Sequence, residues 1–392
     1  MAASVFEQLP APAPAELIDF VEQGLRRSLD IAGIEVREGR VHVSVRDDIT
    51  ESALSHLVRK LVFAARASLI PPHYTHAGTR LFTEDPLPIL EARGDVQRVG
   101  DGLFLFQGDF LSVFRGLDRW MLDLARKRGA IEQEYPPLWP MDLYRRIDYF
   151  RDFPQQVLLC TGVKKTFPSL QAVADGFSRD REFNSIHLDG HFDDAKFGLN
   201  SVACTCGYYT MRNQHQAKDA VYTCYGKAFR NEASETGSLD RLISFSIREI
   251  MYVGSREFVV EMHNTAIRDV KILIELLDLD CAVVSASDPF FGESAGLRNA
   301  LQFTGETKLE ARVPLPFSQQ GMAVGSINDH LTHFGQAFGI RLADGSTASS
   351  GCWGLGFERL TYALFCQYGP DVRAWPSAVR DVLGLAYAER PL

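Results

Sequence analysis

The chain has 392 residues, of which 46% are hydrophobic and 23% charged, and its formal net charge at pH 7 is −9. This balance is typical of a globular protein with a sizeable core, and the acidic charge removes the simplest argument for nucleic-acid binding. No apolar run reaches the about 18 residues of a membrane span and no secretory signal is recognisable, so we expect no membrane segment. The seven scattered cysteines suit a reducing compartment, which favours the cytoplasm.

The N-terminal part predicts a small α/β unit. Apolar residues recur at helical spacing over 15–32, and a second amphipathic pattern, opened by a candidate Thr cap, predicts a helix over 50–69. Between them, residues 34–48 alternate on both sides of a Glu-Gly pair, which predicts a β-hairpin. Residues 70–88 are rich in Pro, Gly and Thr and are typical of a linker. We therefore assign residues 1–90 to an N-terminal appendage with its linker.

The main domain is expected over residues 91–392. Its first strong pattern lies at 109–128, where apolar residues at i, i+3, i+4 and i+7 predict an amphipathic helix that ends before Gly129. Further along, the predicted strands lie at 222–232, 241–251, 281–288, 308–315 and 321–327, and the predicted helices at 255–277 and 357–368. A large sheet with few crossover helices predicts an α+β fold, in which helices flank a mainly antiparallel sheet.

The first two of these strands would form a charged hairpin. Side chains two apart on a strand share a face, so Arg230 and Glu232 point the same way, and Arg241, Phe245 and Glu249 share a face on the return strand. A guanidinium is suited to a phosphate that gains charge during displacement, and an aromatic ring is suited to stacking on a purine. The alternative is a solvated sheet face whose charges form cross-strand ion pairs.

A glycine-rich segment near the C-terminus favours the first interpretation. In GCWGLGFER, Cys352, Gly354 and Gly356 alternate on a predicted strand, and the helix that follows carries Arg359 in its first turn. Glycines let a nucleotide approach the backbone closely, and a helix N-terminus favours a phosphate. Arg359 would then lie over the outer phosphates.

These segments resemble the signatures of the class II aminoacyl-tRNA synthetases. FRNE with the return strand RLISFSIRE is similar to motif 2 of seryl-tRNA synthetases, and GLGFER is similar to motif 3. The 109–128 helix, followed by Pro136 and Pro137, resembles motif 1, the element through which these enzymes form dimers. The resemblance covers roughly residues 95–375, and it implies the class II catalytic fold and a homodimer.

The resemblance also implies how the chain would hold ATP. Arg230 would bind the α-phosphate and stabilise its charge during the in-line step, and Arg359 would bind the γ-phosphate, which makes these two the catalytic candidates. Glu232 would contact the adenine side, and Phe245 would stack on the adenine. Arg241 completes the set of candidate ATP-binding residues.

A metal site is implied by the same resemblance. Cys204, Glu249 and Cys352 together resemble the zinc site of the archaeal-type seryl-tRNA synthetases. Three protein ligands leave one position open, which would take the amino group of an amino acid. Cys206 is a rival to Cys204, and Cys204 is favoured because Tyr208, four residues later, fits the relatives' pattern better. The alternative is three unrelated buried residues.

The acceptor of the activated amino acid is the remaining question. Archaeal-type seryl enzymes carry a large N-terminal tRNA-binding domain and bacterial ones a long coiled coil, and residues 1–90 resemble neither. No anticodon-binding domain is expected after motif 3. With the segment GSINDHLTHFGQAFGI (325–340), the combination resembles the amino acid:carrier-protein ligases, which are truncated homologues of seryl-tRNA synthetases.

This resemblance implies an ATP- and zinc-dependent enzyme that activates glycine, alanine or serine as the aminoacyl-adenylate. The enzyme would pass the acyl group to the phosphopantetheine thiol of a carrier protein, without tRNA. Mg²⁺ is expected with the ATP, although Ala323 stands where seryl enzymes carry a metal-binding Glu. Two alternatives stay open: a seryl-type aminoacyl-tRNA synthetase with an atypical N-terminal domain, and a catalytically inactive paralogue with a regulatory binding role.

Overall fold

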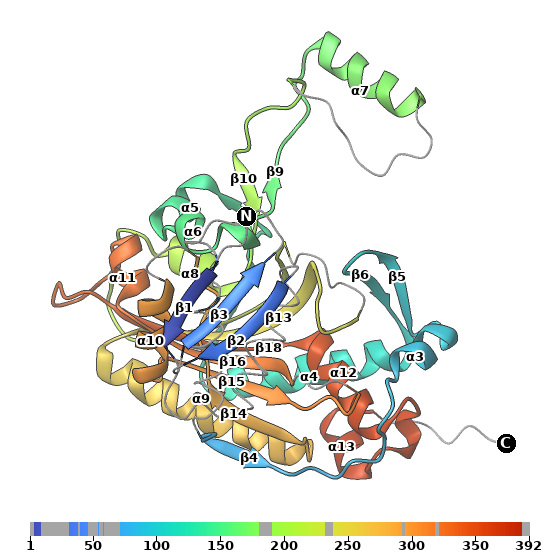
Figure 1. The fold of residues 1–392 in the computed structure, drawn as a ribbon. Helices are drawn as coiled ribbons and strands as arrows, with labels where there is room; N and C mark the ends of the chain where they lie inside the picture. The colour runs from blue at the N-terminus through green and yellow to red at the C-terminus, as the bar shows by residue number, and fades with distance from the viewer. Residues whose placement is uncertain are drawn as a thin grey trace.

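The structure, a computed structural model, describes residues 4–8, 31–37, 40–45, 54, 58, 71–179, 190–231, 238–291, 295–317 and 321–385. An eight-stranded sheet is its largest element (Figure 1). In sheet order the strands are β4 (Tyr74–His76), β14 (Cys281–Ser285), β15 (Lys308–Val313), β16 (Met322–Leu331), β18 (Ser349–Gly356), β13 (Ser244–Gly254), β12 (Ala220–Phe229) and β7 (Ile131–Gln133). All neighbours run antiparallel except β12 and β7. The mainly antiparallel sheet confirms the predicted fold class.

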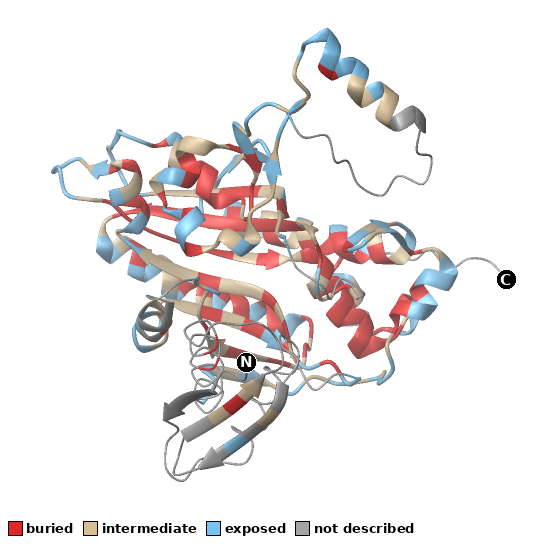
Figure 2. Ribbon diagram, turned by 45° about the horizontal axis from the view of Figure 1, so that its top comes forward, coloured by how far each residue is buried: buried red, intermediate tan, exposed pale blue. Residues whose placement is uncertain are grey.

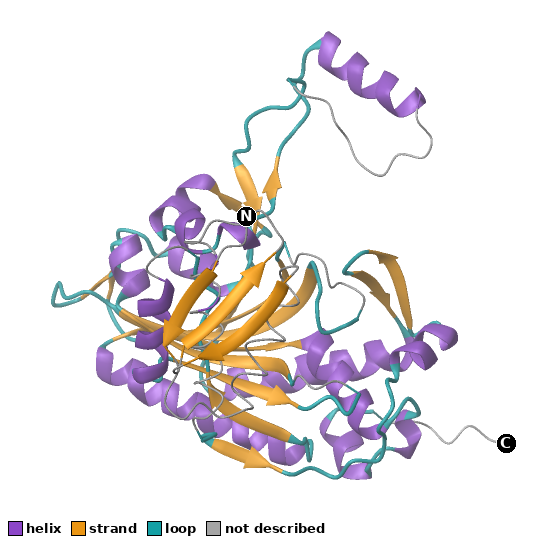
Figure 3. Ribbon diagram, in the orientation of Figure 1, coloured by secondary structure: helices purple, strands orange, loops and turns teal. Residues whose placement is uncertain are grey.

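Three long helices pack on this sheet (Figure 3): α4 (Gly108–Lys127), α9 (Arg256–Leu276) and α12 (Phe357–Tyr368). The apolar stripe predicted for α4 is buried, with Phe110, Phe114 and Leu117 in the main core. Ser255 caps the N-terminus of α9, because its side chain accepts a hydrogen bond from the backbone N–H of Phe258. Each large apolar side chain buried in this core contributes about 1.5–3 kcal/mol. All three helices lie close to their predicted positions.

Most of the remaining elements are short, although one helix reaches 13 residues. The helices are α3 (Leu87–Arg93), α5 (Met141–Arg146), α6 (Tyr149–Asp152), α7 (Phe167–Arg179), α8 (Cys204–Thr210), α10 (Ala295–Thr304), α11 (His333–Phe338) and α13 (Ser377–Val382), with 3₁₀ turns η1 (Pro154–Gln156) and η2 (Val372–Ala374). The strands of smaller sheets are β1 (Ser4–Gln8), β2 (Ile31–Arg37), β3 (Arg40–Val45), β5 (Val96–Gly100), β6 (Leu103–Phe106), β8 (Leu138–Pro140), β9 (Leu159–Cys160), β10 (Phe197–Leu199), β11 (His215–Gln216) and β17 (Arg341–Leu342). α7 lies well away from the large sheet, beyond β9 and β10 (Figure 1). Among the described helices, none combines the length and apolar character needed to cross a membrane.

The strand register separates the two faces of the large sheet. One row of cross-strand partners belongs entirely to the core under the helices: Leu309, Ile327, Trp353 and Ile250. Side chains of the flanking rows point to the opposite face, which we term the site face. One flanking row consists of Glu310, Ser326, Gly354, Glu249 and Cys224, and the other of Lys308, Asn328, Cys352 and Met251. Burial is concentrated in these strands and in the helices beside them (Figure 2).

The described part of the N-terminal region contains a three-stranded sheet. β2 and β3 form the hairpin predicted over 34–48. β1 pairs with β3 as a third strand, which was not predicted. Within the predicted helix over 50–69, Leu54 and Val58 are described, and both are helical and buried. Most of the predicted helix over 15–32 lies outside the described residues, and its last two residues belong to β2.

The prediction of a linker over 70–88 was wrong in part. Residues 74–76 form β4, which pairs with β14 at the edge of the large sheet. Gly78 lies against the backbone of Asp278, so closely that a Cβ there would be 2.0 Å from the Asp278 carbonyl oxygen. Glycine is therefore needed here for close packing rather than for a flexible connection. The division of the chain into two domains at about residue 90 remains a prediction.

Candidate active site and metal centre

Two cysteines and a glutamate meet on the site face. The Sγ atoms of Cys204 and Cys352 lie 3.8 Å apart, and Cys352 Sγ lies 3.7 Å from a carboxylate oxygen of Glu249. One ligand atom from each residue lies within 4.8 Å of the other two, and all three residues are buried. The three predicted metal ligands are thus brought together from distant segments. Cys206, the rival of Cys204, does not join this group.

The separations fit a tetrahedral zinc ion. Two Zn–S bonds of about 2.3 Å at the tetrahedral angle put the sulfur atoms about 3.8 Å apart, and the two cysteine sulfurs have this separation. Thiolates and a carboxylate are also donor types that zinc uses in proteins. Among the described residues, no other His, Cys, Asp or Glu belongs to the group. A zinc ion held by these three would therefore keep a fourth position open.

Each of the three donors is held by a different element. Glu249 lies within β13 and Cys352 on the adjacent β18, while Cys204 is the first residue of α8. The backbone N–H of Cys204 donates a hydrogen bond to Glu249 with an N–O distance of 2.7 Å. Gly354 lies opposite Glu249, and a Cβ at Gly354 would be 2.8 Å from Glu249 Cγ. The glycine therefore provides the space that the carboxylate occupies.

Burial and mutual repulsion govern the charge of this group. Burial first, and then the charge on Cys352, raise the pKa of Glu249 to about 7. The Cys204 thiol donates toward the Cys352 sulfur, which raises the pKa of Cys204 well above its usual value and lowers that of Cys352 well below. Ionisable groups that share one buried space carry a large desolvation cost unless a counter-charge is present. A bound cation would supply that counter-charge.

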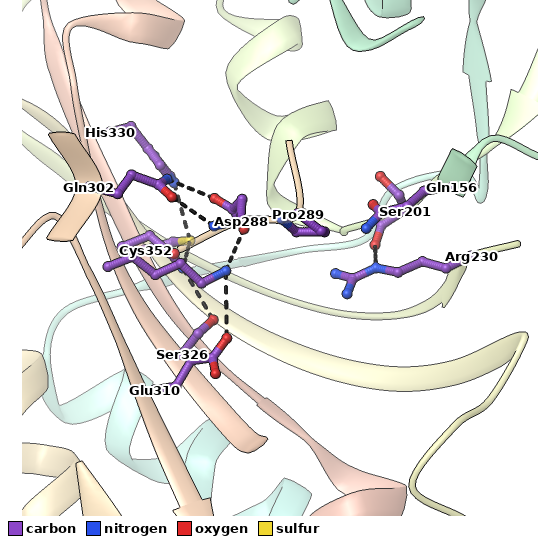
Figure 4. A network of polar contacts seen from close by, with 12 residues as sticks. Gln156, Ser201, Arg230, Asp288, Pro289, Gln302, Glu310, Ser326, His330 and Cys352 are labelled. Carbon is purple, nitrogen blue, oxygen red and sulfur yellow. Dashed lines mark hydrogen bonds and ion pairs between the residues drawn. The ribbon is translucent and has the colours of Figure 1, made fainter. Parts of the chain in front are cut away.

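Two further residues, both from β16, reach the same sulfur. Asn328 Nδ2 and His330 Nε2 each lie 3.7 Å from Cys352 Sγ. Figure 4 shows His330 and Ser326 beside Cys352. Neither Asn328 nor His330 was predicted as a site residue. The signal that reveals Asn328 is the strand register, because it is the direct cross-strand partner of Cys352.

Arg230, the candidate ligand of the α-phosphate, lies beside the segment that leads into α8. Arg230 follows the last residue of β12, and its Nε donates a hydrogen bond to the carbonyl oxygen of Ser201 at 3.3 Å (Figure 4). Its guanidinium carbon lies 5.2 Å from the centre of the Phe245 ring. Ser201 precedes Cys204 by three residues. One short segment therefore connects a candidate metal ligand, Cys204, with a cation and an aromatic ring.

The first turn of α12 carries two charged residues with different tasks. Arg359 Nη1 donates to the carbonyl oxygen of Ala323 on β16 at 3.4 Å. Its neighbour Glu358 is fully buried, and its carboxylate accepts hydrogen bonds from the backbone N–H of Ser246 at 2.7 Å and from the Ser246 hydroxyl at 2.9 Å. Lys227 lies 3.2 Å from the same carboxylate. Glu358, which was not predicted, thus ties α12 to β12 and β13.

The predicted hairpin is present, but the ends of its two strands nearest the turn were predicted wrongly. β12 ends at Phe229 and β13 begins at Ser244, so Arg230 and Arg241 do not lie on the strands predicted at 222–232 and 241–251. Beyond the strand ends one cross-strand hydrogen bond is still made, because the backbone N–H of Arg230 donates to the Ile243 carbonyl oxygen at 3.0 Å. The N–H of Ile243 donates instead to Gly102, in the turn between β5 and β6, at 3.1 Å. Glu232 lies outside the described residues. The assignment of Arg241 and Glu232 to ATP remains a prediction.

A network of charged and polar side chains lies beside β15 on the site face (Figure 4). Lys308 forms an ion pair with Asp288 and lies 3.9 Å from Glu310, and Gln302 donates to Asp288 at 2.8 Å. Burial alone would lower the pKa of Lys308, but the two carboxylates outweigh burial and raise it. Glu310 is the cross-strand partner of Ser326. Fixed charges therefore border the site beside β15.

Comparison with known proteins identifies the family. No family model matches the chain. Amino acid–(acyl-carrier-protein) ligase 1 of Bradyrhizobium diazoefficiens is 28% identical over 303 residues, which span 77% of this chain and 90% of that protein. Ligase 2 of the same organism is 30% identical over 267 residues, or 68% of this chain and 78% of that protein. The chain belongs to the amino acid–(acyl-carrier-protein) ligases. The prediction of a ligase of this family is confirmed.

The ligase is also similar to seryl-tRNA synthetases. The type-2 serine–tRNA ligase of Methanococcus maripaludis is 26% identical over 314 residues, 77% of this chain but only 61% of that protein. The M. kandleri seryl enzyme, solved with A. aeolicus tRNASec, has a TM-score of 0.69 at 20% identity, over 99% of this chain and 79% of that one. The Pyrococcus horikoshii seryl-tRNA synthetase, solved with ATP, has a TM-score of 0.56 at 14% identity, over 79% and 63%. The ligase therefore has the class II synthetase fold, as predicted.

Proposed function

We propose that the ligase activates a small amino acid with ATP as the aminoacyl-adenylate and transfers the acyl group to the phosphopantetheine thiol of a carrier protein. Glycine, alanine and serine are the candidate substrates. One observation carries the proposal: Cys204 belongs to a buried set of metal-type donors, and Ser201, three residues earlier, accepts a hydrogen bond from Arg230. A single site is thereby suited to an amino group at one end and a phosphate at the other. The two relatives named as amino acid–(acyl-carrier-protein) ligases support it.

In the first step, an oxygen of the substrate carboxylate attacks the α-phosphorus of ATP, a new P–O bond forms and pyrophosphate leaves. Arg230 would pair with the α-phosphate as its charge rises, and Arg359 would hold the outer phosphates, so that fixed cations stabilise the transition state. Phe245 would stack on the adenine, next to the Arg230 guanidinium that lies over its ring. Mg²⁺ would accompany the ATP, with ligands other than residue 323, which is alanine.

Cys204, Glu249 and Cys352 would hold zinc, which their separations fit. When bound, zinc would supply a Lewis acid for the amino group of the substrate. The backbone N–H of Cys204 fixes the position of the Glu249 carboxylate. Behind the donors, the Tyr208 ring stacks on Phe334 with centroids 4.6 Å apart, and its hydroxyl donates to a backbone carbonyl at 2.6 Å. This stacking joins α8, which carries Cys204, to α11.

In the second step, the thiol sulfur of the carrier attacks the carbonyl carbon of the adenylate. A C–S bond forms, the bond between the carbonyl carbon and the phosphate oxygen breaks, AMP leaves, and the thiol proton passes to water. The residues described above would contribute by holding the adenylate in position, because a mixed anhydride needs little further activation toward a thiol.

The experiment that tests this function offers the purified enzyme ATP and radiolabelled amino acids with two acceptors in parallel. One acceptor is a phosphopantetheinylated carrier protein and the other is total tRNA. Label on the carrier is expected, and label on tRNA alone rejects the proposal. A preceding screen of ATP–pyrophosphate exchange with each of the twenty amino acids identifies the substrate.

A second candidate function is aminoacylation of tRNA. The observation in its favour is that the likeness to the M. kandleri seryl enzyme extends over 99% of this chain. The two-acceptor experiment distinguishes the two functions directly. A catalytically inactive regulator is a third candidate, and it would give no amino-acid-dependent exchange of pyrophosphate.

We further propose that the enzyme works as a homodimer in the cytoplasm. α4 and the short β7 correspond to the motif 1 segment, and β7 is an edge strand of the large sheet whose Ile131 is 59% exposed. A second copy of the chain would cover this edge. All seven cysteines are free thiols, which suits a reducing compartment. Gel filtration with light scattering measures the oligomeric state.

A further inference from the structure

We propose that Asn328 and His330 are positioning residues that each donate a hydrogen bond to the sulfur of Cys352. These hydrogen bonds would set the orientation of the sulfur and the affinity with which it binds a metal. The inference rests on the proposed metal site. It assigns a task to two residues of β16 whose side chains contact Cys352.

The first hydrogen bond follows from the strand register. Asn328 and Cys352 are direct cross-strand partners on β16 and β18, and their side chains lie on the same face. The amide nitrogen of Asn328 lies 3.7 Å from Cys352 Sγ and also donates to the Ser326 hydroxyl at 3.2 Å. Its two N–H groups therefore serve two acceptors, which fixes the orientation of the amide.

The second hydrogen bond comes from a ring held between aromatic side chains. The His330 ring makes edge contacts with Tyr208 at 5.6 Å and with Phe334 at 4.8 Å between centroids. Its Nε2 lies 3.7 Å from Cys352 Sγ, whereas Nδ1 is buried and has no hydrogen-bond partner among the described residues. Since only Nε2 faces an acceptor, the proton of the neutral ring belongs on Nε2. His330 is then a donor to the sulfur.

His330 is not a fourth metal ligand in this geometry. The group whose ligand atoms all lie within 4.8 Å of one another contains Cys204, Glu249 and Cys352 but not His330. Hydrogen bonds to a thiolate spread its negative charge and hold its orientation, and partners of this kind typically change metal affinity by about tenfold or more. The two donors would therefore tune the ligand while leaving the open coordination position to the substrate.

The test measures metal binding rather than activity. Wild-type enzyme is compared with Asn328→Leu and His330→Phe, which keep the volume but lose the N–H, and with His330→Gln, which keeps a donor. Zinc affinity is measured by competition with a chelating dye. In the cobalt-substituted proteins, the sulfur-to-cobalt charge-transfer band reports the electron density on the thiolate. Near-ultraviolet circular dichroism establishes that each variant is folded.

The expected result is a loss of roughly tenfold in zinc affinity for Asn328→Leu and for His330→Phe. The charge-transfer band should move to longer wavelength in both variants, because a thiolate without hydrogen bonds gives up electron density more easily. His330→Gln should recover most of the affinity and the band position. His333→Phe is the matched control, since the His333 ring also contacts Phe334, at 5.0 Å, yet makes no hydrogen bond to the sulfur.

Two results would overturn this inference while leaving the proposed metal site intact. Wild-type affinity and an unshifted band in both apolar variants would show that the contacts do nothing for the metal. Complete loss of zinc in His330→Phe, equal to that of Cys352→Ser, would make His330 a ligand instead of a positioning residue. If the wild-type enzyme itself binds neither zinc nor cobalt, the metal site of the proposed function fails, and this inference fails with it.

Discussion

Gly354 and Glu249 face each other across β18 and β13 so closely that a methyl group on Gly354 would lie 2.8 Å from Glu249 Cγ. We expect Gly354→Ala to push the carboxylate away from Cys352 and to lower zinc affinity roughly tenfold. Overpacking should also reduce the free energy of unfolding by about 1–3 kcal/mol. Metal analysis and urea unfolding measure the two effects.

The matched control for this change is Gly226→Ala. Gly226 lies on the neighbouring strand β12, and a Cβ there would meet nothing closer than Ala203 Cβ at 3.7 Å. We expect it to keep wild-type zinc binding and stability. Undiminished zinc in Gly354→Ala would contradict the role given to the glycine.

Serine substitutions distinguish the proposed cysteine metal ligands, Cys204 and Cys352, from Cys206. Cys204→Ser and Cys352→Ser should each lower the zinc content and abolish amino-acid-dependent pyrophosphate exchange, because a hydroxyl is a far poorer zinc ligand than a thiolate. Cys206→Ser should retain both properties, since Cys206 is buried but does not join the three-residue group. Full zinc content in Cys352→Ser would refute the metal assignment. Atomic emission and exchange assays provide the measurements.

Removal of the Arg230 guanidinium should abolish adenylate formation without unfolding the protein. Arg230→Ala loses the cation proposed for the α-phosphate and one side-chain hydrogen bond, to Ser201. We expect pyrophosphate exchange to fall by about 10²–10³, the usual effect of losing one preorganised charge-stabilising donor. The midpoint of thermal unfolding and the oligomeric state should stay unchanged. Arg145→Ala, at an 81% exposed side chain, is the control, and retained exchange in Arg230→Ala would disprove its role.

Glu358→Gln should weaken both stability and ATP binding. The carboxylate is fully buried and accepts from the Ser246 backbone and hydroxyl, with Lys227 beside it. An amide cannot satisfy all these donors, so a loss of about 1–3 kcal/mol in unfolding free energy is expected. The KM for ATP should rise as well, because Arg359 is the next residue of the same helix turn. Glu257→Gln, at an exposed position in the first turn of α9, should change neither.

Sequence patterns predicted the parts of the site that have local signatures. α12 with Arg359 in its first turn and β18 with Cys352 follow from alternation and helical spacing. The ligand set was predicted from the resemblance, and the register of β13 and β18 brings Glu249 and Cys352 side by side. These features can be predicted locally because the hydrophobic periodicity of a strand or a helix is visible within a short segment.

Other parts depend on contacts between distant segments and were missed. β4 has only three residues in a Pro-rich stretch, and it is a strand because β14 offers an open edge. Asn328 becomes part of the site only through its register opposite Cys352, and the irregularity after Asp329 changes that register for the next residues. Glu358 is flanked by motif residues, and its partners on β12 and β13 are more than 100 positions away. Long-range pairing of this kind leaves no periodic trace in one sequence.

The 3.8 Å between the sulfurs of Cys204 and Cys352 has a practical consequence for handling the enzyme. A disulfide needs an S–S distance of about 2.05 Å, which a small approach of the two thiols would reach once an oxidant takes up two electrons. A metal bound to both thiolates would protect them, so the chelator-treated protein is the form most sensitive to air. Preparations stored with a chelating buffer and no reductant should lose activity, and dithiothreitol with zinc should restore it.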